Sequence, residues 1–129
     1  MCSIAGMMDL RRDLREHAVC FRAMQESMAH RGPDQNGIFL EPNIALLHNR
    51  LSVIDPENGR QPMTALRGDE SYTIVYNGEL YNTDELRDYL IRAGYDFSTR
   101  CDTEVLLKAY IHWGADCVDR LNGIFAFAV

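Results

Sequence analysis

The chain has 129 residues and a mass of 14.7 kDa, and 47% of its residues are hydrophobic, 25% charged and 9% aromatic. This length allows one small domain and excludes two independent cores, and the composition is that of a folded chain rather than a disordered one. The net charge of −6 and the pI near 5.1 exclude the basic surface that nucleic acid or anionic lipid attracts, so neither nucleic acid nor a membrane is expected as a partner.

No apolar run approaches the roughly 20 residues that a membrane helix needs, and the N-terminus lacks the basic region and apolar stretch of a secretory signal. We therefore expect a cytoplasmic protein. Most of the acidic excess lies in residues 65–129, which would suit a site for a cationic group, although an acidic solvated surface is the commoner explanation.

The cysteines show no pattern typical of disulfides or zinc, because Cys2, Cys20, Cys101 and Cys117 form no C-x-x-C pair and the chain has no secretory signal. The four histidines have no ligand spacing either, so no metal site is expected. Cys20 and Cys117 lie in predicted helices and are expected to be small core residues.

The first predicted elements are a strand and a helix. Residues 3–8 form a short, unbroken apolar run, which is typical of a buried strand. Apolar residues then recur every three or four positions over residues 13–30, which predicts an amphipathic helix. Arg31-Gly32-Pro33-Asp34 ends this helix in a structured turn, because proline cannot continue it.

The middle of the chain predicts three strands and a long loop. Strands are expected at residues 37–41 and 44–51, joined by a tight turn at Pro42-Asn43. Residues 55–70 are rich in proline, glycine and asparagine and predict a long loop, which is more often functional than a mere connection. Residues 72–76 are β-branched and aromatic and predict the third strand.

Two helices follow. Asn82 and Glu85 form a possible capping box at the start of a helix over residues 84–93, which Gly94 ends. A second helix is expected over residues 102–113.

The chain ends on a predicted short helix at residues 115–121, a turn at Asn122-Gly123 and a strand at residues 124–129. Because a domain seldom ends within its most hydrophobic strand, where an open sheet edge invites pairing, we expect a truncated chain.

A candidate nucleophile lies at the second position. Cys2 follows Met1 and is small enough for the usual removal of that methionine, which would leave a thiol and a free α-amine on one residue. An α-amine has an ordinary pKa of about 7.7 to 8.0 and a thiol of about 8.5, so the amine can take the thiol proton at cellular pH. The thiolate is then a strong nucleophile toward an acyl carbon. Taken alone, a cysteine at this position usually occurs by chance and has no catalytic role.

Short motifs occur in order along the whole chain, namely M-C-S-I-A-G, R-G-P-D, H-N-R-L-S-V-I-D, G-R-Q-P-M, V-Y-N-G-E-L-Y-N, C-D-T-E and L-N-G-I-F-A-F-A. Together they resemble the glutaminase domain of asparagine synthetases, which belongs to the class II glutamine amidotransferases. R-G-P-D alone is a weak signal, whereas N-G-E-L-Y-N with an N-terminal cysteine and a later D-x-E is a strong one. The resemblance implies an α+β fold, the N-terminal-nucleophile hydrolase four-layer αββα sandwich of antiparallel sheets, incomplete at its C-terminus.

The resemblance also implies the catalytic groups. Cys2 matches the nucleophile that attacks the side-chain amide of glutamine, forms a thioester and releases ammonia, after which water releases glutamate. Asn77 and Gly78 match the oxyanion hole, through a side-chain N–H and a backbone N–H respectively. The loss of one such donor costs about 2.7 to 4 kcal/mol of transition-state stabilisation.

Substrate-binding groups follow from the same resemblance. Arg50 matches the residue that binds the α-carboxylate of glutamine, a role that suits a planar guanidinium. Glu79 and Asp102 match the partners of the substrate ammonium. The remaining matches are backbone carbonyls of two residues near the nucleophile and an arginine that supports its surroundings, namely Leu51, Val53 and Arg31.

Each of these residues also has an ordinary structural explanation. Arg50 could be a surface arginine, Glu79 a charge at a strand end, and Asp102 the N-cap of the following helix, where aspartate is favoured. For Asp102 we expect both roles. Ser3 stands where the commonest family start has glycine, as it does in some asparagine synthetases.

The resemblance further implies that residues 1–129 are a truncated N-terminal glutaminase domain and that a synthetase domain is absent. That domain carries an S-G-G-x-D-S motif, uses ATP and Mg²⁺ and makes asparagine from aspartate, while no cofactor is expected in these residues themselves. It also implies glutamine as the substrate and a homodimer as the assembly. If Met1 stays attached, the nitrogen of Cys2 is an amide and cannot act as a base, so the chain would be inactive or weak.

Two other functions stay open. The chain could be the glutaminase domain of an amidotransferase with another ammonia acceptor, as in glucosamine-phosphate or purine synthesis. It could also be an inactive fragment whose unfinished sheet pairs with another chain.

Overall fold

Two three-stranded antiparallel sheets form the middle of the computed structural model, which describes residues 2–52 and 57–129. The first sheet has the order β1-β3-β2 and consists of β1 (Ser3–Met8), β2 (Gln35–Glu41) and β3 (Ile44–Arg50). The second has the order β4-β5-β6 and consists of β4 (Met63–Arg67), β5 (Glu70–Leu80) and β6 (Gly123–Ala128).

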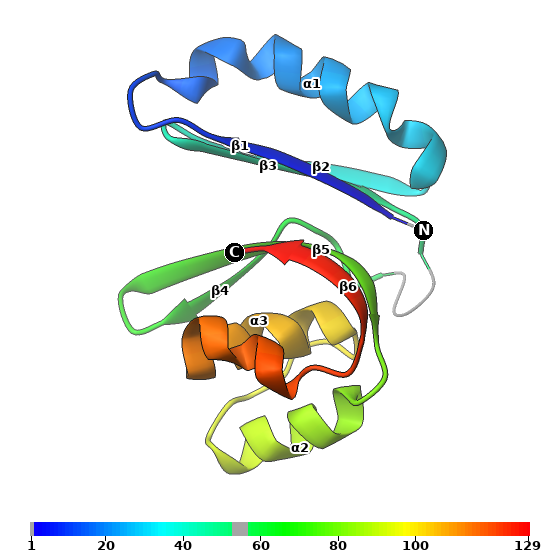
Figure 1. Cartoon of the computed structure of the whole chain (residues 1–129), viewed down its shortest axis with the longest axis vertical. Helices are drawn as coiled ribbons and strands as arrows, with labels where there is room; N and C mark the ends of the chain where they lie inside the picture. Colours follow the sequence, from blue (N-terminus) through cyan, green and yellow to red (C-terminus); the bar gives the residue numbers. More distant parts are fainter. Residues whose placement is uncertain (1, 53–56) are drawn as a thin grey trace.

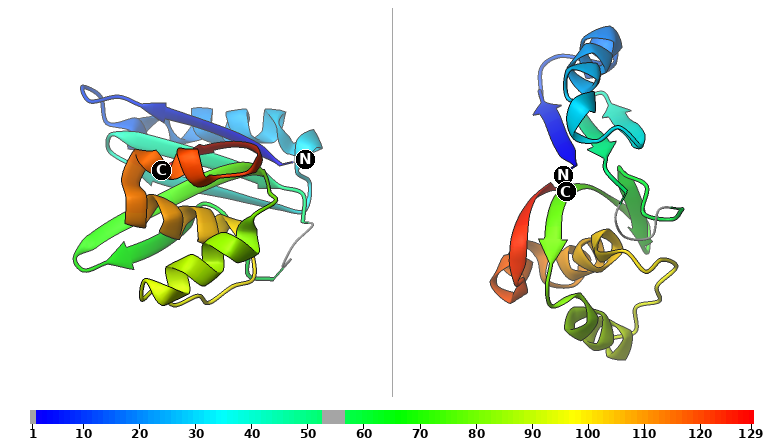
Figure 2. Two further views of the ribbon diagram at one scale, coloured as in Figure 1. Left: turned by 60° about the horizontal axis from the view of Figure 1, so that its bottom comes forward. Right: turned by 90° about the vertical axis from the view of Figure 1, so that its right-hand side faces the viewer.

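Helices cover the outer faces of this pair of sheets (Figure 1). Helix α1 (Ala18–Ser27) lies on the first sheet, α3 (Asp102–Trp113) lies on the second, and α2 (Thr83–Arg92) packs beside α3. Two further views show α1 at one outside of the stack and α2 and α3 at the other (Figure 2). The predicted α+β class and the layered sandwich of antiparallel sheets are therefore confirmed.

The predicted helix over residues 13–30 is confirmed as a helical segment in three parts. A 3₁₀ turn, η1 (Leu14–His17), leads into α1, and a second one, η2 (Ala29–Arg31), follows it. The predicted strand at residues 3–8 coincides with β1, and the hairpin between β2 and β3 pairs Glu41 with Ile44 across the predicted turn.

One face of the segment formed by η1 and α1 packs on the first sheet through Leu14 of η1 and Phe21 of α1. Gln25 continues this face, and its side-chain amide donates to the carbonyl oxygen of Gly37 at 2.8 Å. Cys20 lies on the other face and is exposed, so its prediction as a core residue is wrong.

The second sheet differs from the sequence-based expectation in two respects. Strand β5 is longer than the predicted strand at residues 72–76, and β4 was not predicted. Residues 63–67, within the predicted loop 55–70, form β4, and Arg67 pairs with Glu70 of β5 across a short turn. The strand was missed because turn residues flank it on both sides and its stability comes from pairing with β5, which sequence periodicity does not report.

The helices beside the second sheet begin and end near their predicted limits. α2 ends in a Schellman motif, in which Gly94 at φ +93° donates to Ile91 and Tyr95 donates to Leu90. The predicted capping box is wrong, because the Asn82 side chain makes no hydrogen bond that caps α2.

The buried apolar residues form one cluster under α1 and two others around α3. The first of these two joins β5 to α3, and the second joins α2 to α3 and contains Cys117, whose predicted burial is confirmed. In residues 2–52 and 57–129, no helix combines the length and the apolar composition that crossing a membrane requires.

Candidate active site

A cavity of about 250 Å³ opens between the start of β1, the end of β3, the middle of β5 and the first turn of α3. Most of the residues predicted for the site line this cavity, and they are Cys2, Arg50, Leu51, Asn77, Gly78, Glu79 and Asp102. Val53 lies outside the described residues. Arg31 belongs to η2, is exposed and is not among the lining residues.

Cys2 is half-buried and lies beside the segment that leaves β3. Its position follows from the pairing of β1 with β3, which sets the next residue, Ser3, opposite Asn49. The backbone N–H of Leu51 donates to the Cys2 sulfur at 3.4 Å, and the Leu51 carbonyl oxygen lies 3.6 Å from that sulfur. Leu51, predicted to offer its carbonyl to the substrate, thus contacts the thiol through both backbone groups.

Asn77 and Gly78 lie inside β5, which continues beyond the predicted strand at residues 72–76. They pair with Ala126 and Phe125 of β6, so the backbone at this point is held by the strand ladder. A Cβ atom on Gly78 would lie 2.3 Å from the carbonyl oxygen of Ile124, which excludes any side chain without a shift of β6. The glycine is therefore required by the close approach of the neighbouring strand.

Arg50 is the cationic group of the cavity and is only 5% exposed. Its guanidinium donates to the Gln35 side-chain oxygen at 2.9 Å, and the two residues pair across β2 and β3. A buried guanidinium held in this way differs from the surface arginine of the ordinary explanation, because its position is fixed by the sheet.

Two carboxylates, Glu79 and Asp102, line the same cavity from different elements. Glu79 is exposed on β5, and Asp102 is the first residue of α3 and is 9% exposed. Asp102 does not cap α3 as predicted, because Cys101 occupies the N-cap position. Its carboxylate instead accepts a hydrogen bond of 2.8 Å from the hydroxyl of Tyr76.

Four polar residues of the cavity wall were not predicted from the sequence, namely Gln61, Tyr76, Tyr81 and Thr103. The side-chain oxygen of Gln61 accepts from the backbone N–H of Tyr76 at 2.6 Å, and its side-chain nitrogen donates to the Thr103 hydroxyl at 3.1 Å. Two features of the sequence could have identified Tyr76 and Gln61 as site residues. Tyr76 directly precedes Asn77, and Gln61 lies within the G-R-Q-P-M motif.

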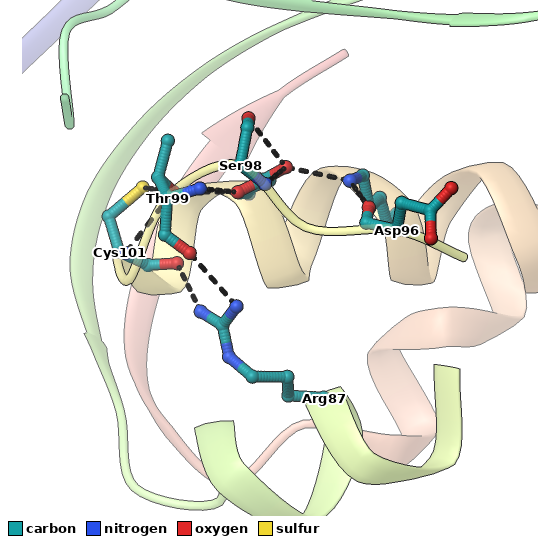
Figure 3. Close-up of polar contacts among 7 residues, drawn as sticks. Arg87, Asp96, Ser98, Thr99 and Cys101 are labelled. Carbon is teal, nitrogen blue, oxygen red and sulfur yellow. Dashed lines mark hydrogen bonds and ion pairs between the residues drawn. The ribbon is translucent and has the colours of Figure 1, made fainter. Parts of the chain in front are cut away.

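Buried charges hold the loop that leads into Asp102 (Figure 3). The Glu104 carboxylate accepts from the backbone N–H groups of Ser98 at 3.0 Å and Thr99 at 2.7 Å, and pairs with the Lys108 ammonium at 2.6 Å. Burial alone would raise the pKa of Glu104, but these hydrogen bonds outweigh burial and lower it to about 2. The carboxylate is therefore ionised wherever the protein is folded near neutral pH.

Arg87 of α2 holds the same loop from the other side. We call the contacts of Glu104, Lys108 and Arg87 with this loop the clamp. Its guanidinium donates to the carbonyl oxygens of Thr99 at 3.0 Å and Cys101 at 3.3 Å (Figure 3). Because Asp102 follows Cys101 directly, the clamp determines where the Asp102 backbone enters the cavity wall. Among the described residues, no three His, Cys, Asp or Glu side chains lie in a group that could hold a metal ion.

An α+β sandwich of two antiparallel sheets, with Cys2 at the start of its first strand facing the cavity, is the architecture of the N-terminal-nucleophile amidotransferases. The model of the glutamine amidotransferase domain matches residues 1–129, and the chain belongs to this family.

Asparagine synthetases are among the proteins to which this chain is similar. The chain is 47% identical over 129 residues to asparagine synthetase [glutamine-hydrolyzing] 3 of Bacillus subtilis, covering all of this chain and 21% of that protein. It is 39% identical over 130 residues to asparagine synthetase B of Escherichia coli, covering all of this chain and 23% of that protein. The chain thus spans about a fifth of the length of these relatives.

A solved structure is similar as well. Glutamine phosphoribosylpyrophosphate amidotransferase of B. subtilis, complexed with ADP and GMP, superposes with a TM-score of 0.57 at 26% identity. The match covers 68% of this chain and 21% of that chain.

Proposed function

We propose that this chain hydrolyses the side-chain amide of glutamine to glutamate and ammonia through a thioester on Cys2. The observation that carries the proposal is the cavity itself, which gathers a thiol, an Asn-Gly pair, one guanidinium and two carboxylates from β3, β5, α3 and the residue before β1. Membership of the glutamine amidotransferase domain family supports the same substrate.

In the proposed reaction the α-amine of Cys2 takes the thiol proton, and the thiolate attacks the amide carbon of glutamine. The oxygen of the tetrahedral intermediate accepts hydrogen bonds from the side chain of Asn77 and the backbone N–H of Gly78. The protonated amine gives its proton to the leaving nitrogen, and the C–N bond breaks to release ammonia. The α-amine then takes a proton from the water that attacks the thioester. The C–S bond breaks, the sulfur receives this proton, and glutamate and the free thiol are formed.

The same proposal assigns the two ends of the substrate. Arg50 binds the α-carboxylate, and Glu79 and Asp102 bind the α-ammonium, with backbone carbonyls of Leu51 and Val53 nearby. Arg31 is proposed to support the region of the nucleophile. One cation and two anions in a cavity of about 250 Å³ suit a free amino acid better than a peptide, since a peptide carries neither charge at its linked ends.

Removal of Met1 is part of the proposal, because a neutral α-amine is the only base assigned to the Cys2 thiol. A chain that keeps Met1 has an amide at this position, with no lone pair for the proton. We propose that the processed chain is the active form.

We further propose that the ammonia serves an ATP-dependent synthetase domain that makes asparagine from aspartate, as the names of the relatives indicate for those proteins. ATP and Mg²⁺ belong to that domain, whose S-G-G-x-D-S motif does not occur in these 129 residues. A cytoplasmic homodimer is proposed as the working form. The alternatives are another ammonia acceptor or an inactive strand-pairing fragment.

The test of glutamine hydrolysis is a steady-state assay of glutamate release on processed protein, with intact mass confirming that Met1 is gone. Cys2→Ala should abolish release, whereas Cys20→Ala, at an exposed position on α1, should leave it unchanged. Equal glutamate release by wild-type and Cys2→Ala protein would end the proposal. A monodisperse monomer in light scattering would count against the strand-pairing alternative.

A further inference from the structure

Tyr76 is held in place by three different parts of the fold. Its hydroxyl donates to Asp102 of α3 at 2.8 Å, and its backbone N–H donates to the side chain of Gln61 at 2.6 Å. Its carbonyl oxygen lies 3.1 Å from the ring nitrogen Nε2 of His48 in the first sheet. Every polar group of this residue, which is 3% exposed, therefore has a partner.

The phenol is aimed at the acidic end of the cavity. Its ring belongs to the core between β5 and α3, beside Leu106 and Leu107, while Tyr76 and Asp102 both line the cavity. A phenylalanine would fill the same core position, so the hydroxyl is not needed for packing. The hydroxyl instead donates to the Asp102 carboxylate, and this contact needs a separate explanation.

From this geometry we infer that Tyr76 is a positioning residue that selects substrates with a free α-ammonium, by fixing the orientation of the Asp102 carboxylate. The inference rests on the proposed function, in which Asp102 binds the ammonium. A carboxylate has two oxygens, and the Tyr76 hydroxyl occupies Oδ2. This holds the plane of the carboxylate and leaves its other oxygen as the acceptor for the substrate.

The Tyr76 hydroxyl, which is the donor, stays protonated at neutral pH. Burial is the main cause that raises the pKa of Tyr76 far above its ordinary value of 10.0, and the negative charges of Asp102 and Glu79 raise it further. The Tyr76 hydroxyl therefore remains available as the donor of this hydrogen bond. A carboxylate fixed in this way does not lose rotational freedom when the substrate arrives, so the ammonium binds more tightly.

The experiment compares two ligands in a background without turnover. Cys2→Ala protein is titrated by calorimetry with L-glutamine and with glutaramate, which is glutamine without the α-amino group. Adding Tyr76→Phe should weaken glutamine binding about tenfold, the loss expected for a hydrogen bond to a charged group. Glutaramate binding should not change, so the selectivity for the ammonium should fall by the same factor.

Two controls separate positioning from damage to the fold. Tyr72→Phe lies on the same strand and loses a hydroxyl that bonds to Glu70, away from the cavity, so both affinities should stay at the parent value. In an Asp102→Asn background, Tyr76→Phe should add less than a twofold effect, because its partner is already altered.

Turnover on processed protein with Cys2 intact keeps the two proposals apart. Tyr76→Phe should raise KM for glutamine with kcat nearly unchanged. Wild-type protein that binds glutamine selectively but releases no glutamate would contradict the proposed hydrolysis and not the role of Tyr76. Equal losses for both ligands, an unchanged selectivity, no detectable glutamine binding, or full additivity with Asp102→Asn would each overturn the role of Tyr76.

Discussion

The ring nitrogen Nε2 of His48 in the first sheet lies 3.1 Å from the carbonyl oxygen of Tyr76 in the second. Since a carbonyl only accepts, Nε2 carries the proton of the neutral ring, and Nδ1 has no hydrogen-bond partner among the described residues. His48 is 1% exposed. This contact joins the two sheets at the residue that directly precedes the proposed oxyanion pair, so it links the stability of the sandwich to the geometry of the cavity.

The first prediction concerns the stability of the fold below neutral pH. Burial, and to a smaller degree the charge of Arg50, lower the pKa of His48 from 6.5 to about 4. Between these values the unfolded chain binds a proton that the folded protein does not, so the free energy of unfolding falls as the pH falls. The expected loss is on the order of 3 kcal/mol from pH 7 to pH 4.

Urea unfolding at several pH values measures this loss. His48→Gln should flatten the dependence between pH 6.5 and 4, because the group that takes up the proton in the unfolded state is gone. His17→Gln, at an exposed position, should keep the wild-type slope. An equal slope in wild type and His48→Gln would show that His48 is not the source.

A second prediction concerns the clamp around Glu104. Glu104→Gln removes the charge that Lys108 pairs with and weakens the acceptor of the Ser98 and Thr99 N–H groups, so the free energy of unfolding should fall by about 1 to 3 kcal/mol. Since the clamp holds the loop before Asp102, affinity for glutamine should fall as well. Glu85→Gln, exposed on α2, is the matched control and should change neither quantity.

The contribution of Glu104 to the stability of the fold should decrease as the pH falls. The folded-state pKa of Glu104, about 2, is below its ordinary value of 4.5, so its contribution to stability is present above pH 4.5 and is lost as the pH falls toward 2. Glu104→Gln should therefore lose less stability than wild type over this range. A steeper acid dependence in the variant than in wild type would contradict the assignment.

A third prediction concerns the approach of β6 to β5. Gly78→Ala would place a Cβ atom 2.3 Å from the Ile124 carbonyl oxygen, which forces the two strands apart. The expected destabilisation is about 1 to 3 kcal/mol, with a loss of glutaminase activity, because the proposed oxyanion donor moves with the strand. Ser71→Ala, at an exposed position on the same strand, should leave the free energy of unfolding measured by chemical denaturation unchanged. A fully stable and active Gly78→Ala protein would refute the requirement for glycine.

A fourth prediction tests the side chain proposed for the oxyanion hole. Asn77→Ala should lower kcat by about 10²- to 10³-fold with a smaller effect on KM, because the donor acts on charge that develops in the transition state. Asn43→Ala, in the turn between β2 and β3, is an exposed control that should keep wild-type kinetics. A change in KM alone would indicate a binding role instead.

Much of the secondary structure could be predicted, because its signals are local. The strand at residues 3–8, the hairpin of β2 and β3 and the helix after Asp102 were all found from apolar periodicity and turn residues. β4 was not found, since a short strand between turn residues is stabilised by its partner. Cys20 was misplaced because a helical pattern does not settle which small residue faces the sheet.

By itself, the order of the motifs determined the family and named seven of the residues that line the cavity, since these depend on residue types and their sequence positions. Only the tertiary structure decided how they meet. Three sets of contacts join residues from 26 to 49 positions apart. They are the bond between Tyr76 and Asp102, the two backbone contacts of Leu51 with Cys2, and the contact of His48 with Tyr76. The first joins β5 to α3, the second follows from the pairing of β1 with β3, and the third joins the two sheets. No local pattern of the chain encodes such contacts.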